Sequence, residues 1–258
     1  MEKSKIGWLN GGNTFNPWIG CAAVSTACAN CYARRENARR GWCKDFSRDR
    51  HVTSAAYWRQ PFAWNRRSDP ARATLVFCGS LCDVFERDSA LWEPRQRLWN
   101  VIDATPRLRW LLLTKRPQNI REMTPPGGLP LNVWLGVTAE NRKAAEERIP
   151  VLLDIPCAGR FVSCEPLLET IDIERWLSGR DKLDWVIAGG ESGNGPGIRE
   201  TTCAAFKWMW RDCRAHGVPF FFKQFGDQFS KRLKKRAEFA ECREWPESFN
   251  AEAQRRRD

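Results

Sequence analysis

The chain has 258 residues, of which 42% are hydrophobic, and this is enough to bury a sizeable core and to exclude disorder as the main state. No window reaches the roughly 18 apolar residues that a membrane span needs. The first residues also lack the apolar stretch of a signal peptide. We therefore expect a protein of the cytoplasm with no membrane partner.

The formal charge of +11 is unevenly distributed along the chain. Residues 1–72 carry 13 basic and 5 acidic side chains, residues 73–222 carry 19 of each, and residues 223–258 carry 10 and 7. A neutral middle between basic ends suits a partner that carries phosphates, such as DNA or a modified nucleotide. Basic ends that serve only solubility are the alternative.

Apolar runs bounded by polar, Gly or Pro residues recur from residue 74 onward. They predict strands at residues 74–79, 109–114, 133–137, 160–164, 185–189 and 218–223, with a seventh possible near 14–19. The runs lack strict alternation, so we expect strands that are buried on both faces, as in a parallel sheet. Amphipathic stretches at 90–103, 141–153 and 202–216 predict helices between them. This pattern predicts an α/β fold, a full or partial (β/α) barrel, with an open doubly wound sheet as the alternative.

Polar residues follow each predicted strand, at the end where parallel sheets build their sites. One cavity is therefore expected from Ser80, Cys82, Asp83, Lys115, Arg116, Thr138, Glu140, Asn141, Glu165, Glu191 and Gln224. For any one of them, a helix cap or a turn is an equally good interpretation.

Eleven cysteines, an odd number, do not suit a disulfide framework in a reducing compartment. Six lie in apolar or helical surroundings and are expected to be buried thiols without a ligand: Cys78, Cys157, Cys164, Cys203, Cys213 and Cys242. Cys21, Cys28 and Cys31 are different, because they form a C-x6-C-x2-C motif within eleven residues. Three thiolates on a 4Fe–4S cluster leave one iron open to a small molecule. Structural zinc, with Cys43 or a later cysteine as fourth ligand, is the alternative.

Several blocks along the chain together resemble the phage family named for its gene products 37 and 68, which is related to the radical S-adenosylmethionine (SAM) enzymes. They are NPWIGC, CYARR, FCGSLCDVF, LLLTKRPQNI, NVWLGVTAEN, RFVSCEPL, DWVIAGGESG and VPFFFKQFG, in this order. The three-cysteine loop also resembles that of spore photoproduct lyase-like enzymes. The resemblance implies a radical SAM barrel over residues 1–227, with a cluster loop at 20–34, a basic aromatic insertion at 35–72 and a basic tail at 228–258.

The resemblance also implies the cofactors and their contacts. Cys21, Cys28 and Cys31 are expected to hold a 4Fe–4S cluster, which a flavodoxin-like or ferredoxin-like protein would reduce. The methionine end of SAM would bind the open iron. The residues expected to bind SAM are Ser80, Lys115 and Thr138, which match lyase-like contacts at successive strand ends, and Glu140 and Asn141.

The substrate is the least determined part of the interpretation. Glu165, Glu191 and Cys82 are the candidate catalytic residues. Arginines alternate with Tyr57, Trp58, Phe62 and Trp64 in the insertion, a mixture that suits phosphates and stacked bases, although a solvated helical face with core aromatics is as good an interpretation. We expect hydrogen abstraction that rearranges or isomerises an amino-acid adduct on thymine during hypermodification of phage DNA, which protects that DNA from restriction. The alternatives are a zinc-stabilised nucleic-acid-binding protein without catalysis, and a radical SAM enzyme acting on a small metabolite or a protein.

Overall fold

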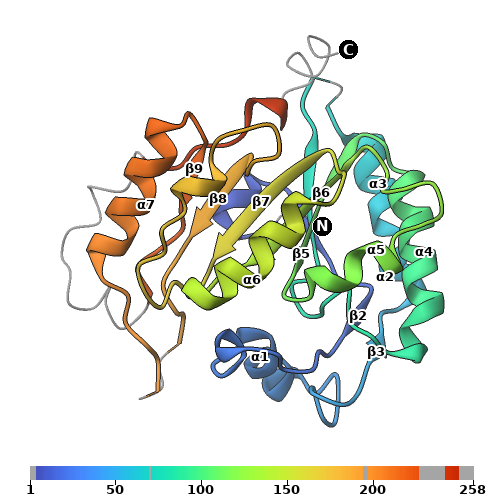
Figure 1. The fold of residues 1–258 in the computed structure, drawn as a ribbon. Coiled ribbons are helices and arrows are strands. Elements are labelled where there is room, and N and C mark those ends of the chain that lie inside the picture. Colours follow the sequence, from blue (N-terminus) through green and yellow to red (C-terminus); the bar gives the residue numbers. More distant parts are fainter. Residues whose placement is uncertain (1–3, 70, 194–196, 227–241, 250–258) are drawn as a thin grey trace.

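A curled sheet of seven parallel strands is the centre of the molecule (Figure 1). The computed structural model describes residues 4–69, 71–193, 197–226 and 242–249. In sheet order the strands are β1 (Asn13–Phe15), β4 (Thr74–Cys78), β5 (Leu108–Thr114), β6 (Val133–Thr138), β7 (Gly159–Cys164), β8 (Trp185–Ala188) and β9 (Phe220–Phe222). Each pair of neighbours is parallel, so the predicted α/β fold is confirmed in its partial-barrel form.

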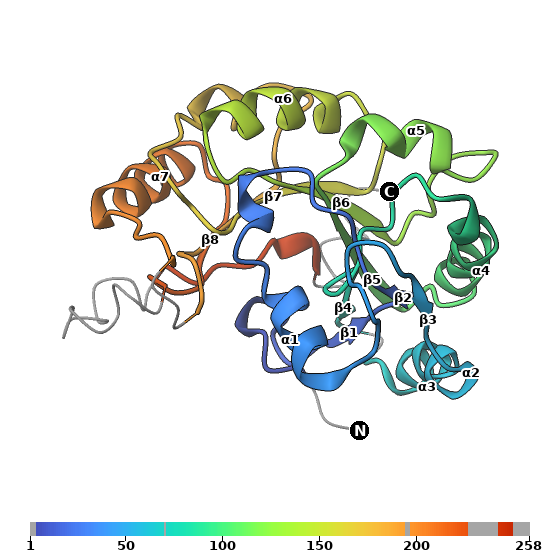
Figure 2. The ribbon, with the colours of Figure 1, turned by 90° about the horizontal axis from the view of Figure 1, so that it is seen from below.

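The helices cover the outer side of this arc, as Figure 2 shows. The predicted helices are present as α4 (Trp92–Asp103), α6 (Arg142–Leu153) and α7 (Cys203–Ala215). The sequence did not predict α1 (Tyr32–Arg40), α2 (Ala55–Trp58), α3 (Gln60–Arg67) or α5 (Ile120–Met123). A small antiparallel pair, β2 (Trp18–Ile19) and β3 (His51–Val52), carries α1 away from the arc, so that α1 lies across the carboxyl ends of the strands.

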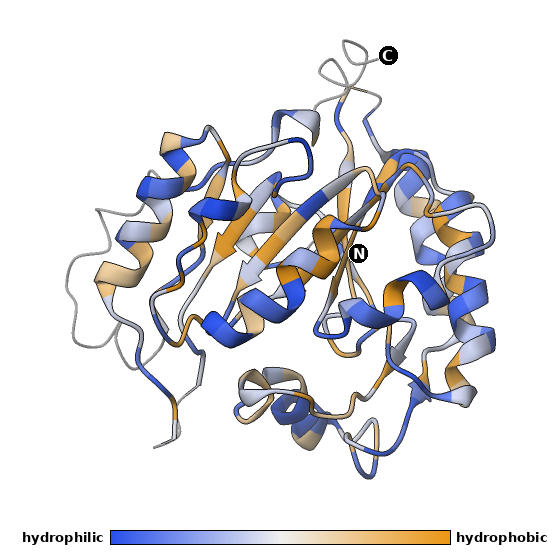
Figure 3. Cartoon of the chain, viewed as in Figure 1, coloured by the Kyte–Doolittle hydropathy of each residue, from blue (hydrophilic) through white to orange (hydrophobic). Residues whose placement is uncertain are grey.

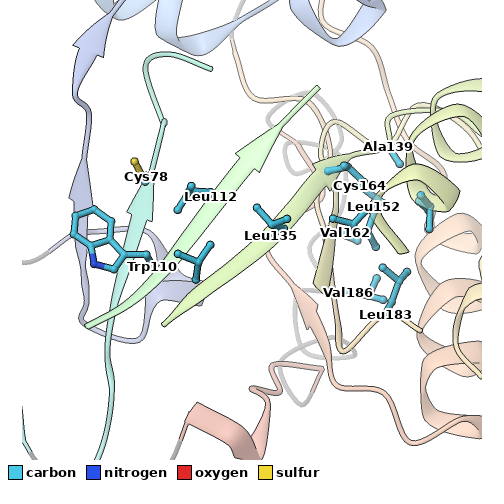
Figure 4. Close-up of a cluster of buried hydrophobic side chains, with 14 of the residues drawn as sticks. Cys78, Trp110, Leu112, Leu135, Ala139, Leu152, Val162, Cys164, Leu183 and Val186 are labelled. Carbon is cyan, nitrogen blue, oxygen red and sulfur yellow. The ribbon is translucent and has the colours of Figure 1, made fainter. Parts of the chain in front are cut away.

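The convex face of the sheet packs against the helices through hydrophobic side chains. Trp110 and Leu112 of β5, Leu135 of β6 and Val162 of β7 are fully buried there, together with Leu152 of α6 (Figure 4). Figure 3 shows the same division, because the strands are mainly hydrophobic while α4 and α6 alternate between hydrophobic and hydrophilic turns. Burial on both faces explains why the strand sequences do not alternate between apolar and polar residues.

The concave face is filled by aromatic rings near the amino ends of the strands. Trp8 packs edge-on against Phe77 of β4 and Trp185 of β8, and Phe249 packs against Trp185. Residues 242–249, part of the predicted tail, thus belong to the core, and the Trp245 indole donates to the Trp8 carbonyl at 2.7 Å. The basic runs at 231–236 and 255–257 lie outside the described residues. Among the residues that the structure describes, no helix has both the length and the apolar character needed to cross a bilayer.

Two glycines on this concave face allow two aromatic rings to lie flat on the sheet. Gly136 of β6 faces Phe161 of β7 in register, and Gly159 of β7 faces Trp134 of β6. A Cβ at Gly136 would lie 2.3 Å from the Phe161 ring, and one at Gly159 would lie 2.2 Å from the Trp134 ring. The rings therefore need glycine at both positions.

Replacing Gly136 by Ala is expected to destabilise the protein by about 1–3 kcal/mol, because the Phe161 ring has no room to move away within the packed interior. Chemical unfolding in urea measures this difference. Gly7→Ala is the matched control, since its Cβ would meet Phe221 at 3.6 Å, an ordinary contact distance. Equal stability of the two variants would contradict the packing described here.

Candidate functional site

A cavity of about 500 Å³ opens at the carboxyl ends of the strands, between the sheet and α1. Its volume is in the range of small-molecule sites. Polar or sulfur-containing side chains from six strand ends and from the cysteine loop line it: Cys21, Cys28, Cys31, Ser80, Cys82, Asp83, Lys115, Arg116, Thr138, Ser163, Glu165, Glu191, Ser192 and Lys223.

The cysteine loop leaves β2 through a turn that only glycine can make. Gly20 has a φ of +113°, and a Cβ there would lie 2.1 Å from the Asp49 carbonyl oxygen. The backbone amide of Cys21 then donates to the Phe46 carbonyl at 2.9 Å. Cys31 occupies the cap position before the first turn of α1. The turn and the helix together bring the three cysteines to the cavity wall.

The three thiols have different surroundings. Burial, together with the charge of Asp83, raises the pKa of Cys21 to about 12, although Arg116 acts in the opposite direction. Burial also opposes ionisation of Cys28, but the positive charge of Lys115 and backbone hydrogen bonds outweigh it, so the pKa of Cys28 is lowered. Cys28 is therefore the thiol that ionises most readily of these two.

The donor set suits an iron–sulfur cluster. In the described part of the chain, no three Cys, His, Asp or Glu side chains lie close enough together to hold a single metal ion. A 4Fe–4S cluster instead binds each thiolate through a different iron, so its ligands stand further apart. Three thiols distributed around one cavity fit that requirement.

A buried ion network connects the start of the loop to β4 and β5. Arg116 contacts the carboxylates of Asp83 at 2.8 Å and Glu86 at 3.2 Å, and Arg50 contacts Glu86 at 2.7 Å. Glu86 also accepts a hydrogen bond from the Ala22 amide at 2.9 Å. All four charged side chains are no more than 7% exposed, so the loop is held by charges that water does not screen.

Glu140 connects the middle of the loop to β6. Its carboxylate accepts hydrogen bonds from the Ala27 amide at 3.4 Å and from Arg148 at 2.8 Å. Burial opposes its ionisation, but a hydrogen bond from Ser25 and the charge of Arg148 outweigh it, so the pKa of Glu140 lies below its ordinary value of 4.5. Asn141 caps α6 through the Ala144 amide.

Glu191 connects the end of the loop to β8. It accepts a hydrogen bond from the Asn30 side chain at 2.9 Å and pairs with the Arg199 guanidinium. Arg35 of α1, just after the loop, donates to the Ser192 carbonyl at 2.7 Å. Three carboxylates, Glu86, Glu140 and Glu191, thus fix the loop at three points.

The structure brings most of the predicted site residues to one cavity. Ser80, Cys82, Lys115, Thr138 and Glu165 line it with the three cysteines. Two residues expected to bind the cofactor, Glu140 and Asn141, are outside the lining, because Glu140 is fully buried against Arg148 and Asn141 caps a helix. Glu191, expected to act in catalysis, lines the cavity, but its carboxylate is already paired with Arg199.

The lining includes residues that were not predicted from the sequence, and Lys223 and Ser163 are two of them. Lys223 follows β9 and forms an ion pair with Glu165, and Ser163 lies within β7. Both occupy concave positions, two residues after Phe221 and Phe161 respectively, whose rings fill the lower interior. Because side chains along a strand alternate between the two faces of the sheet, these positions could have been identified from the sequence.

The aromatic residues of the basic insertion are part of the core. Trp58 is 1% exposed, Trp64 is 8% exposed, and the Tyr57 ring stacks on Phe15. Phe62 packs against the same cluster. These rings are not available for stacking on bases, so the interpretation as core anchors is the correct one for them.

Glu140→Gln is expected to lower the free energy of unfolding by about 3 kcal/mol at pH 7, because it leaves Arg148 buried without a counter-charge. A carboxylate with a lowered pKa stabilises the fold above pH 4.5 and loses this contribution as the pH falls through its folded pKa. The difference from the wild type should therefore shrink as the pH falls below 4.5. Urea unfolding at a series of pH values measures it. Glu147→Gln, at an exposed ion pair, should change stability by less than about 0.5 kcal/mol, and a similar loss in both variants would contradict the anchoring role.

Comparison with known proteins gives a family for the chain. No curated protein and no solved structure matched it. One family model, described as protein of unknown function (DUF5131), matches residues 3–252, nearly the whole length. The half-barrel and the cysteine-lined cavity are therefore features of a member of the DUF5131 family, to which this chain belongs.

Proposed function

We propose that the protein is a radical SAM enzyme that binds one 4Fe–4S cluster through Cys21, Cys28 and Cys31. The observation that carries this proposal is that the three thiols and the predicted SAM contacts line a single cavity at the carboxyl ends of parallel strands. When bound, the cluster and SAM would supply a radical able to remove hydrogen from an unactivated C–H bond. The chain itself has to position the groups and exclude water.

Lys115 is the best contact for the SAM carboxylate. It follows β5 and lines the cavity, and its positive charge favours the ionised forms of Cys28 and Glu140 and so lowers the pKa of each. No ion pair of its ammonium is found among the described residues, so it can accept a carboxylate partner. Ser80 and Thr138, at the ends of β4 and β6, flank it with hydroxyl groups that suit the polar parts of SAM.

The substrate faces the wall formed by β7, β8 and β9. Glu165 and Lys223 form an ion pair beside Gly189. Their side chains are 21% and 29% exposed, respectively, and both line the cavity, so a charged substrate can reach both groups. Cys82, which follows β4, also lines the cavity, and burial raises its pKa well above the ordinary value, so it keeps the S–H that a hydrogen-atom donor requires.

Phosphates suit the outer surface of α1. Arg39 and Arg40 are 66% and 54% exposed in their side chains, and Arg34 is exposed while lining the cavity mouth. This basic surface lies next to the cavity. It supports the more specific proposal of a DNA substrate, in which the enzyme rearranges or isomerises an amino-acid adduct on thymine as part of a phage DNA modification that protects against restriction.

Anaerobically reconstituted protein is expected to convert SAM to 5′-deoxyadenosine in the presence of dithionite, and Cys28→Ala is expected to abolish this product. Liquid chromatography with mass spectrometry measures it. Cys157→Ala is the matched control, because Cys157 is a partly buried thiol that packs against the convex core and is not part of the cavity lining. A protein that binds one zinc, no iron and no sulfide would establish the zinc-stabilised alternative instead.

Replacing Arg34, Arg39 and Arg40 together by Gln is expected to weaken DNA binding. The slope of the logarithm of the binding constant against the logarithm of the salt concentration should become shallower by about 2–3, since each lost phosphate contact reduces that slope by about 0.9. Fluorescence anisotropy at several salt concentrations measures both. Arg87, Arg121 and Arg175 are equally exposed and provide the control triple variant. The same loss of slope in both triple variants, or no salt dependence at all, would favour a metabolite or protein substrate.

A further inference from the structure

Arg116 contacts the sulfur of Cys21 directly. One terminal nitrogen of its guanidinium, Nη1, donates to Cys21 Sγ at 3.5 Å and to Asp83 Oδ2 at 2.8 Å. The other, Nη2, donates to the Ala22 carbonyl at 2.8 Å and to Glu86 at 3.2 Å. The side chain is 7% exposed, so four partners hold the guanidinium in one orientation.

The other two cysteines lack such a contact. Cys28 has the Ser25 hydroxyl at 4.0 Å and feels the charge of Lys115 from a distance. Cys31 stands at the amino end of α1, the positive end of the helix dipole. In the described part of the chain, Arg116 is the one charged side chain that donates a hydrogen bond to any of the three sulfurs.

We propose that Arg116 sets the reduction potential of the cluster through its hydrogen bond to Cys21, an inference that rests on the proposed function. A donor on a ligand sulfur withdraws electron density from the metal, and it stabilises the reduced cluster more than the oxidised one because the reduced cluster is more negative. Removing the donor therefore shifts the potential to more negative values. Arg116 acts as a positioning and tuning residue and does not contact substrate.

The local charge balance makes the hydrogen bond the decisive part of this effect. Arg116 and Arg50 carry two positive charges, and Asp83 and Glu86 carry two negative ones. The four charges sum to zero, so the network has no net charge of its own. The short contact to the Cys21 sulfur does not cancel, because no other group of the network reaches that atom.

Arg50 offers a matched control. It binds the same carboxylate, Glu86, through two nitrogens at 2.7 and 2.9 Å, and it is as buried as Arg116. In the described part of the chain, no hydrogen bond joins its guanidinium to Cys21. Arg50→Gln therefore removes one positive charge and one anchor of the loop while leaving the sulfur contact in place.

The experiment is an anaerobic redox titration of the reconstituted protein, followed by electron paramagnetic resonance of the reduced cluster. Arg116→Gln is expected to have a more negative midpoint potential than the wild type. Arg116→Lys should shift in the same direction, because an ammonium keeps the charge but loses the fork that reaches sulfur and carboxylate together. Arg50→Gln should stay close to the wild type.

Three results overturn the inference: an unchanged potential in Arg116→Gln, an equal shift in Arg50→Gln, or loss of the cluster in both Arg116 variants while Arg50→Gln keeps it, which would show that Arg116 only assembles the loop. Wild-type protein that forms no 4Fe–4S cluster overturns the proposed function as well. Wild-type protein that forms the cluster and cleaves SAM, with equal potentials in all variants, overturns the inference alone.

Discussion

The buried charges that hold the cysteine loop to the sheet are the constraint on which the site depends. The loop has little apolar surface of its own, since its core cluster consists of Ile19, Ala33, Cys43 and Phe46 with a few partly buried neighbours. Its position is fixed instead by Glu86, Glu140 and Glu191, each at a different strand end. Buried ion pairs add little net stability, but they fix the carboxylates as specific acceptors, because any other position of the loop leaves its amide donors without these partners.

The sheet provides these anchors and the cavity through one simple rule of strand geometry. Alternate residues point to the concave side, so each strand contributes aromatic or aliphatic residues near its amino end and polar residues near its carboxyl end. On β7 the concave series is Phe161, Ser163 and Glu165, and on β9 it is Phe221 and Lys223. The same half-barrel is therefore a packed core at one end and a polar cavity at the other.

The sequence was enough to predict the parallel half-barrel and most of the cavity lining. Continuous apolar strands such as residues 109–114 are unambiguous, because they require cover on both faces, and polar residues just after them can only lie at the same sheet edge. What could not be predicted was how polar groups are used. In the sequence, Glu140 and Lys115 are both polar residues that follow a strand. In the structure, Lys115 lines the cavity, whereas Glu140 is paired with Arg148, which lies eight residues later on α6. Trp58 and Trp64 likewise reveal their burial only once β1 and β4 are assembled.

These anchors also bear on how the proposed cluster would relate to folding. In small metal-dependent domains, the metal provides the folding energy and the ligands come together only with it. Here the loop is bonded to carboxylates that follow three strands, through the Ala22 and Ala27 amides and the Asn30 side chain. Under the proposed function, the protein's own hydrogen bonds would therefore position the loop, and a bound cluster would add its binding energy to theirs.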